Sequence, residues 1–148
     1  MNDSHLTASA VVSFSQDLER RAAEFYEVLE RHFPEHVVAL RDFALVCIKT
    51  SVEVIRTYQE TVSDALETGF SFSGISLSDY RIDLILPESP TWDEALQMAR
   101  ALEDTASAFY QDAATSSEGL LASIQRTFKR AARSHQKQRE ALERLSRP

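Results

Sequence analysis

Residues 18–26 read LERRAAEFY, and residues 102–110 read LEDTASAFY. Five of these nine positions are identical at the same spacing, which indicates an internal repeat. Within each copy, the glutamate, alanine and tyrosine follow one another at steps of three and four residues, as on one face of a helix. A phenylalanine follows each copy at nearly the same offset, Phe43 after the first and Phe128 after the second. We therefore predict that the repeated unit is a helical hairpin.

Four helices are expected from the apolar periodicity around these copies. The first runs from about Asp17 to Phe33, and the second carries its inward stripe from Phe43 to about Leu66. Thr91 and Glu94 have the spacing of a capping box, which marks the start of the third helix. The fourth follows the polar stretch around Gly119. With only 3 Gly and 4 Pro, the chain offers few breaks to these segments, which favours an all-α protein.

The segment between the two predicted hairpins, residues 68–90, has no helical period. A connection of this length fits an antiparallel bundle in which the chain is carried along the bundle between its second and third helices. The hairpins are expected at 15–67 and 91–146, within one bundle domain of residues 15–148. Residues 1–14 are expected to form a flexible tail.

Composition restricts the remaining classes of protein. A single cysteine, Cys47, excludes an internal disulfide framework and a paired-cysteine redox centre. The first residues do not resemble a secretion signal, and nowhere do about 18 apolar residues run together. We therefore expect a cytoplasmic protein with no membrane segment.

Basic residues are concentrated near the end of the chain. Residues 126–147 hold eight of the 16 Lys and Arg but only two acidic residues, although the net charge of the whole chain is −7. Such a helix could bind nucleic acid or another anionic partner, or it could simply be a solvated face paired with acidic neighbours. We favour the solvated face, so nucleic-acid binding is not expected, while an unknown protein partner stays possible.

Two glutamates, Glu19 and Glu103, occupy equivalent places in the middle of apolar stripes. Burying a lone carboxylate costs several kcal/mol unless it is paired, protonated or bound to a cation. Two such groups in equivalent positions indicate a shared partner inside the bundle.

The facing helices offer polar side chains at matching offsets, seven and ten residues after each repeated phenylalanine. These are Thr50 and Glu53 in the second helix, and His135 and Gln138 in the fourth. Glu19, Glu53, Glu103 and His135 are therefore expected to converge, with Thr50, Gln138, Tyr26 and Tyr110 around them. Oxygen-rich sites with one imidazole suit iron or manganese and can hold zinc.

At this level of detail the chain resembles the rubrerythrin branch of the ferritin-like superfamily. The resemblance rests on the motif Glu-x-x-Ala-x-x-x-Tyr, which occurs twice in register, and it spans about Leu18 to Leu145. Four-helix proteins of that superfamily hold two irons with a single Glu from two helices and a Glu-x-x-His motif from the other two. The resemblance implies that Glu19 and Glu103 are the single-Glu ligands and that the protein is a non-haem iron oxidoreductase.

The chain departs from that pattern in its second and fourth helices, where no Glu-x-x-His motif occurs. One metal ion therefore fits the predicted site better than two. The alternative is a metal-free scaffold or partner-binding module, in which neighbouring side chains satisfy Glu19 and Glu103. The resemblance also implies a homodimer. We suspect that it forms through the apolar residues of the connecting segment, which are Ile82, Leu84, Ile85 and Leu86.

Overall fold

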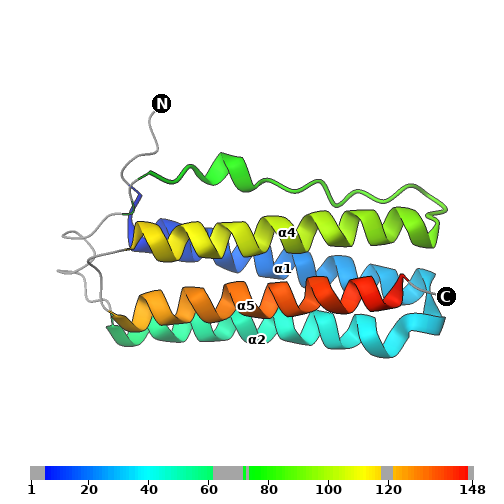
Figure 1. Ribbon diagram of the computed structural model, residues 1–148, viewed down its shortest axis with the longest axis horizontal. Helices are drawn as coiled ribbons and strands as arrows, with labels where there is room; N and C mark the ends of the chain where they lie inside the picture. Colours follow the sequence, from blue (N-terminus) through cyan, green and yellow to red (C-terminus); the bar gives the residue numbers. More distant parts are fainter. Residues whose placement is uncertain (1–5, 62–71, 73, 118–121, 147–148) are drawn as a thin grey trace.

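A computed structural model of the chain describes residues 6–61, 72, 74–117 and 122–146. Four long helices make up most of these residues, and no strand is found among them (Figure 1). The helices are α1 (Ala8–His32), α2 (Val37–Thr61), α4 (Trp92–Ser116) and α5 (Ala122–Leu145), with 3-10 turns η1 (Pro34–His36) and η2 (Leu77–Tyr80). The predicted all-α, four-helix architecture is confirmed.

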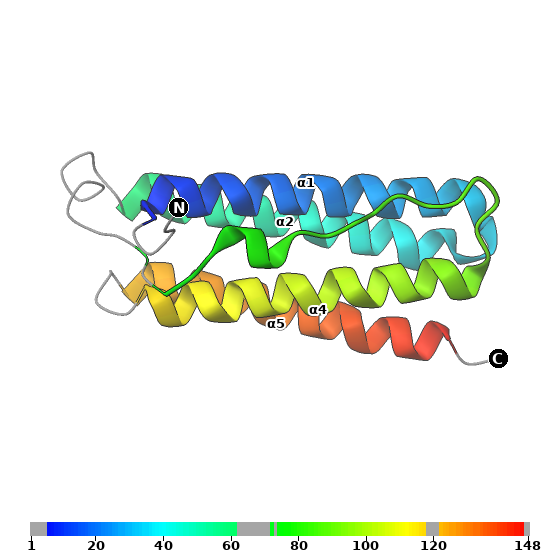
Figure 2. The same ribbon diagram turned by 90° about the horizontal axis from the view of Figure 1, so that it is seen from above.

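The helices are arranged as two packed pairs. α1 packs along α2, α4 packs along α5, and the pairs meet mainly where α2 faces α5 (Figures 1 and 2). The segment from Gly74 to Thr91 lies along the outside of the bundle, over α1 and α4 (Figure 2). Part of the predicted connection, residues 68–71 and 73, lies outside the described residues. The four helices, packed side by side, enclose one shared interior.

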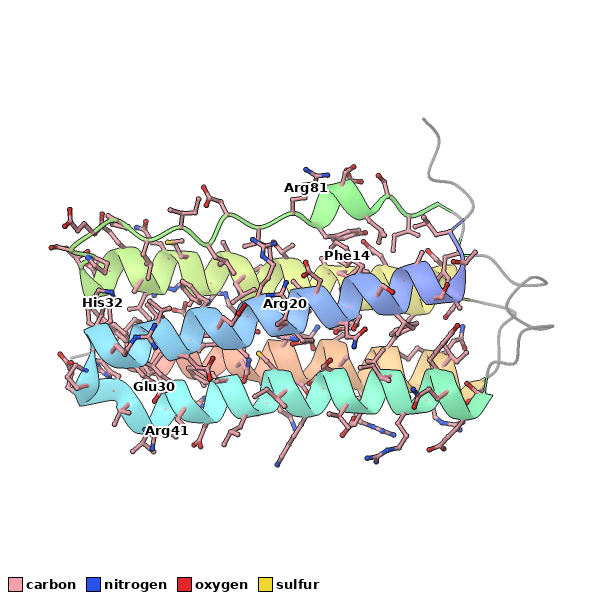
Figure 3. The ribbon with its side chains drawn as sticks, turned by 180° about the vertical axis from the view of Figure 1, so that it is seen from behind. Phe14, Arg20, Glu30, His32, Arg41 and Arg81 are labelled. Carbon is pink, nitrogen blue, oxygen red and sulfur yellow. The ribbon has the colours of Figure 1, made fainter. Side chains whose placement is uncertain are left out.

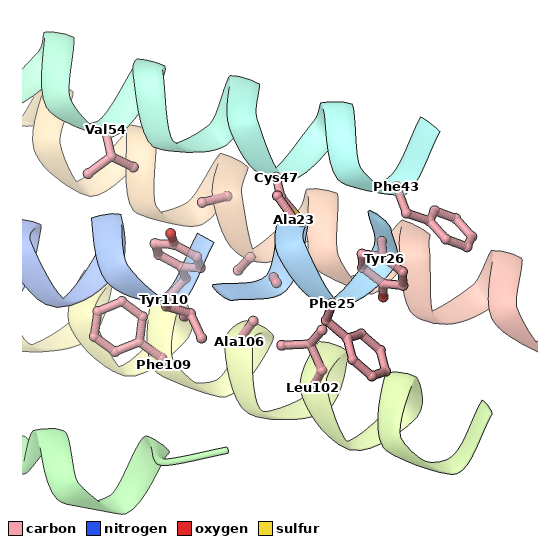
Figure 4. Close-up of a cluster of buried hydrophobic side chains, with 14 of the residues drawn as sticks. Ala23, Phe25, Tyr26, Phe43, Cys47, Val54, Leu102, Ala106, Phe109 and Tyr110 are labelled. Atoms are coloured by element: carbon pink, nitrogen blue, oxygen red, sulfur yellow. The ribbon is translucent and has the colours of Figure 1, made fainter. Parts of the chain in front are cut away.

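Small and aromatic side chains, regularly spaced along the helices, fill that interior. Glu19, Ala22, Tyr26 and Leu29 of α1 follow steps of three and four residues, and all of them are buried. The largest fully buried apolar side chains are Tyr26, Leu29, Leu40, Phe72, Leu102, Phe109, Tyr110, Phe128 and Leu142. Figure 4 shows part of this core, in which Tyr26 from α1 and Tyr110 from α4 both lie inside the bundle.

The first helix begins earlier than the sequence indicated. α1 starts at Ala8, so residues 8–14, expected to belong to a flexible tail, are helical. The Thr7 hydroxyl accepts from the Ala10 amide and caps the helix, while Val11 is buried on the same face as the later stripe. Leu6 also forms an antiparallel bridge with Phe72, with backbone distances of 2.7 and 3.1 Å. The predicted end of the second helix near Leu66 lies outside the described residues.

The connecting segment packs against the bundle along one of its sides. Ile82, Leu84 and Leu86 are partly buried against the core, whereas Ile85 between them is 83% exposed. Arg21 Nη2 of α1 donates to the Ile82 carbonyl oxygen at 2.7 Å and holds the segment in place. Association with a second copy through these residues stays a prediction.

The basic last helix carries most of its charge on its exposed side. Arg139 pairs with Asp104 and Glu143, and Arg130 lies 3.8 Å from the carboxylate of Glu53. These pairs fit the interpretation as a solvated face with acidic neighbours. None of the described helices is both long and apolar enough to span a membrane.

The capping box at the start of α4 is confirmed and should contribute measurably to stability. The Thr91 hydroxyl accepts from the Glu94 amide at 3.1 Å, and the Glu94 carboxylate accepts from the Thr91 amide at 2.8 Å. We expect Thr91→Ala to lower the free energy of unfolding by about 1 kcal/mol, because one helix-end amide loses its acceptor. Thr91→Ser keeps the hydroxyl and should stay near wild type. Urea denaturation of both variants tests this, and equal losses would contradict it.

Candidate functional site

A buried imidazole joins two buried glutamates at the middle of the bundle. Glu19 comes from α1, Glu103 from α4 and His135 from α5, and the exposed fraction of each residue is 1% or less. His135 Nε2 lies 2.8 Å from Glu19 Oε2, and His135 Nδ1 lies 2.5 Å from Glu103 Oε1. Both ring nitrogens can donate together only when the imidazole is protonated. The arrangement can therefore hold a protonated imidazole between the two glutamate side chains.

Two tyrosines supply further hydrogen bonds to the same carboxylates. The Tyr110 hydroxyl donates to Glu19 Oε2 at 2.6 Å, and the Tyr26 hydroxyl donates to Glu103 Oε2. Each tyrosine thus reaches from one copy of the repeat to the glutamate of the other copy. The Tyr110 ring also stacks on His135, with centroids 5.7 Å apart and planes 13° apart.

Gln138, one turn beyond His135 on α5, completes the cluster. Its side-chain amide donates to Glu103 Oε2 at 2.9 Å, and the same nitrogen lies 3.8 Å from Cys47 Sγ of α2. Two buried acceptors in this cluster, Glu19 Oε1 and Gln138 Oε1, have no hydrogen-bond partner within the described part of the chain. Buried acceptors without a donor are uncommon, and each one indicates a water, a proton or a cation that could occupy the site.

The electrostatics of the cluster keep its donors protonated. Burial opposes the charge on His135, but the negative charges and hydrogen bonds of Glu19 and Glu103 outweigh it and raise the pKa of His135 well above its ordinary value. Burial, reinforced by the nearby carboxylates, also raises the pKa of Tyr26, Tyr110 and the Cys47 thiol well above their usual ranges. At neutral pH His135, Tyr26, Tyr110 and Cys47 therefore all keep their protons.

The structure places two of the residues expected at the site elsewhere. The inward position predicted for Glu53 is wrong: its side chain is 49% exposed and faces Arg130. The buried face of α2 includes Thr50 and Val54, which are four residues apart. Glu53 follows Thr50 by only three residues, and in this helix that position is turned toward solvent. Thr50 is buried, but its hydroxyl donates to the Val46 carbonyl oxygen at 2.8 Å and does not join the cluster.

The remaining predicted residues, Glu19, Glu103, His135, Gln138, Tyr26 and Tyr110, meet in one place. Two further members were missed. Cys47 lies on the buried face of α2, one turn before Thr50, and its place beside the cluster was not predicted. Ser15 lies one turn before Glu19, and its hydroxyl is 2.7 Å from that of Tyr110. Ser15 lies four residues before Glu19 and therefore on the same face of α1. This spacing would have predicted Ser15 at the site if the first helix had been predicted to begin at Ala8.

Comparisons of the chain with protein-family models, with curated proteins and with solved structures each found no match. Within the described ranges, no group of three or more His, Cys, Asp or Glu side chains stands ready to hold a metal ion. Each ring nitrogen of His135 already faces one carboxylate. A cation would have to take the place of an imidazole proton.

Removal of a single hydroxyl tests how strongly the network depends on its donors. We expect Tyr110→Phe to lower the free energy of unfolding by about 1.5–3 kcal/mol, because Glu19 loses a buried charged hydrogen bond. Tyr80→Phe is the matched control, since the hydroxyl of Tyr80 donates to Asp112 at the surface. That variant should lose less than about 1 kcal/mol. Chemical denaturation distinguishes the two, and similar losses would contradict a special role for the core.

The protonated imidazole also predicts a pH dependence. The pKa of His135 is raised in the folded state, so the protonated imidazole stabilises the fold. Its contribution to the free energy of unfolding is complete below the pKa of the unfolded state, about 6.5. It is then lost by up to about 1.4 kcal/mol per pH unit as the pH rises through the folded-state pKa. With a chelator present, we expect wild type and the control His32→Gln to lose stability above pH of about 6.5. The double variant Glu19→Gln/Glu103→Gln should not lose stability in this way. An identical slope of stability against pH in all three proteins would overturn the assignment of a protonated His135.

Proposed function

We propose that this chain is a ferritin-like bundle protein of the rubrerythrin-like kind that binds one divalent metal ion, iron or manganese, in its core. The ligands proposed are Glu19, Glu103 and His135. The two packed helix pairs and the path of residues 74–91 along the bundle support an antiparallel ferritin-like arrangement with a long crossover. The repeat at residues 18–26 and 102–110 supports the same origin from two hairpins.

One observation carries the proposal. Two fully buried glutamates from different helices meet at a single imidazole, and the buried oxygens Glu19 Oε1 and Gln138 Oε1 have no donor within the described residues. Carboxylate, imidazole and amide oxygen form a hard donor set that suits iron or manganese and that can also hold zinc. The residues present thus supply donors of a suitable kind. To share one ion, His135 would have to give up a proton and the two carboxylates, which now face opposite ring nitrogens, would have to turn toward the same nitrogen.

Charge favours one ion over two. With His135 neutral, as a metal ligand must be, the two carboxylates carry a charge of −2, which balances one divalent cation. A second ion would need further carboxylates, and Glu53, the nearest candidate by sequence, is exposed on the surface. Iron or manganese bound here would supply redox chemistry, while the protein would contribute a dry, preorganised set of ligands and the two tyrosines beside them.

A second candidate function is a metal-free helical scaffold, and the hydrogen bonds of His135 favour it. An imidazolium between Glu19 and Glu103 already offsets part of their charge, and Tyr26, Tyr110 and Gln138 satisfy three more acceptor positions. Buried networks of this kind can fix helix register when their members are satisfied. Such a protein would act through its surface, as an assembly module.

Metal analysis separates the two candidates. The wild-type protein, expressed with added iron and manganese, should contain about one metal ion per chain, and saturating metal should raise its stability by about 2.7 kcal/mol at a hundredfold excess over Kd. Glu103→Gln should abolish both effects, since it removes a core carboxylate while leaving the side chain similar in size. Glu53→Gln, at the surface, should leave both unchanged.

Loss of metal in both variants would indicate binding outside the core. A wild-type protein that neither contains nor is stabilised by iron, manganese, zinc or cobalt would refute the metal proposal and leave the scaffold.

A further inference from the structure

The two helix pairs each have a groove that reaches a core glutamate. Between α1 and α2 lies a hollow of about 550 Å³ whose lining includes Glu19, Ile48 and Ser51. Between α4 and α5 lies a second hollow of about 480 Å³ whose lining includes Glu103 and Ala108. The two grooves are thus equivalent parts of the repeated hairpin, and they can be compared residue by residue.

The groove between α1 and α2 ends at an unpartnered core atom. Glu19 is 1% exposed, and its Oε1 has no hydrogen-bond partner within the described residues, while Oε2 accepts from His135 and Tyr110. In the other groove, by contrast, both oxygens of Glu103 are occupied. Only the α1/α2 groove therefore presents an acceptor that an arriving cation could bind without first breaking a hydrogen bond.

The difference follows from one position of the repeat. His135 lies seven residues after Phe128 and contacts Glu103, whereas Thr50, seven residues after Phe43, turns its hydroxyl back onto its own helix. Thr50 therefore gives Glu19 no contact like the one that His135 makes with Glu103, and Glu19 reaches across to His135 with Oε2. Its second oxygen, Oε1, has no hydrogen-bond partner within the described residues.

The rim of this groove is also the more acidic of the two. Its described lining holds four carboxylates, Asp17, Glu19, Glu24 and Glu27. The single basic residue in that lining is Arg20 of α1, labelled in Figure 3. Arg20 pairs with Asp17 and Glu24. The α4/α5 groove holds three carboxylates, and Arg139 lies among them. An excess of negative charge around a cleft attracts cations and speeds their association.

We propose that the α1/α2 groove is the route by which a divalent cation reaches the core, with Glu19 Oε1 as the first core atom that it meets. This inference rests on the proposed metal binding at Glu19, Glu103 and His135. The acidic rim gathers cations, and small side chains such as Ala23 and Ser51 leave the passage open. The α4/α5 groove, closed at its inner end by the satisfied Glu103, is not a route.

Cobalt binding to the full chain tests the route by its rate rather than by activity. Co²⁺ is mixed with metal-free protein at low ionic strength, and the visible absorption of the bound ion is followed by stopped flow. Ser51→Leu should slow association about fivefold or more by filling the groove, with the final amplitude preserved. Ala108→Leu, which fills the α4/α5 groove in the same way, should stay within about twofold of wild type.

Glu27→Lys provides a second, electrostatic variant that needs no change in packing, because Glu27 is exposed on the rim of the groove. It should slow association about threefold or more at low salt, and the effect should shrink as salt screens the charge. Glu140→Lys on the rim of the α4/α5 groove is its control. If Ser51→Leu does not fold, as judged by circular dichroism, this pair decides the outcome.

The outcomes separate the route from the function. Wild-type protein that takes up no Co²⁺ refutes the proposed metal binding and the route with it. If wild type binds Co²⁺ but folded Ser51→Leu loads at the wild-type rate, the route is overturned while the metal site stands. Slower loading of Ala108→Leu or Glu140→Lys than of their α1/α2 counterparts would assign the passage to the α4/α5 groove and would likewise overturn the inference.

Discussion

His135 is the one cation found within the fully buried cluster, and the placement of Glu19 and Glu103 depends on it. Two carboxylates with 1% exposure or less would repel each other and lose hydration, and the loss of one partner from such a buried pair is strongly destabilising. The imidazole offers one nitrogen to each carboxylate, so α1, α4 and α5 are tied at a common point. The tyrosines then lock each glutamate from the opposite copy of the repeat. This interaction sets the register of three helices at once.

The repeat explains both the symmetry and the asymmetry of the core. Glu19 and Glu103, and likewise Tyr26 and Tyr110, occupy equivalent places and exchange hydrogen bonds across the bundle. The facing helices have diverged, because α5 contributes polar side chains to the centre while α2 contributes Cys47, Thr50 and Val54. The charged cluster nevertheless spans both helix pairs, with Glu19 from α1 and with Glu103 and His135 from α4 and α5. The groove between α1 and α2 is the larger of the two, at about 550 against 480 Å³.

The helical period could be predicted from the sequence because apolar, small and aromatic residues recur at steps of three and four. That period was sufficient to identify four helices, the capping box at Thr91 and most of the central cluster. It failed where the choice lies between adjacent positions on one helix. Glu53 and Val54 are both compatible with the stripe that passes through Thr50, but in the structure Val54 is buried and Glu53 is exposed. The start of α1 at Ala8 was not predicted. Thr7 is a weak signal of a helix cap unless Ala8 and Val11 are known to be buried.

The side chains of α2 also limit how many ions the core could hold. A two-metal centre needs more than two carboxylates, since each divalent ion brings two positive charges into a region that excludes water. α2 offers the interior a thiol whose pKa is raised by burial and a hydroxyl bonded to its own backbone, and neither supplies negative charge at neutral pH. The negative charge available therefore comes from Glu19 and Glu103 alone. One imidazolium therefore offsets half of the charge of two carboxylates and one divalent ion offsets all of it, whereas two divalent ions would leave an excess of positive charge.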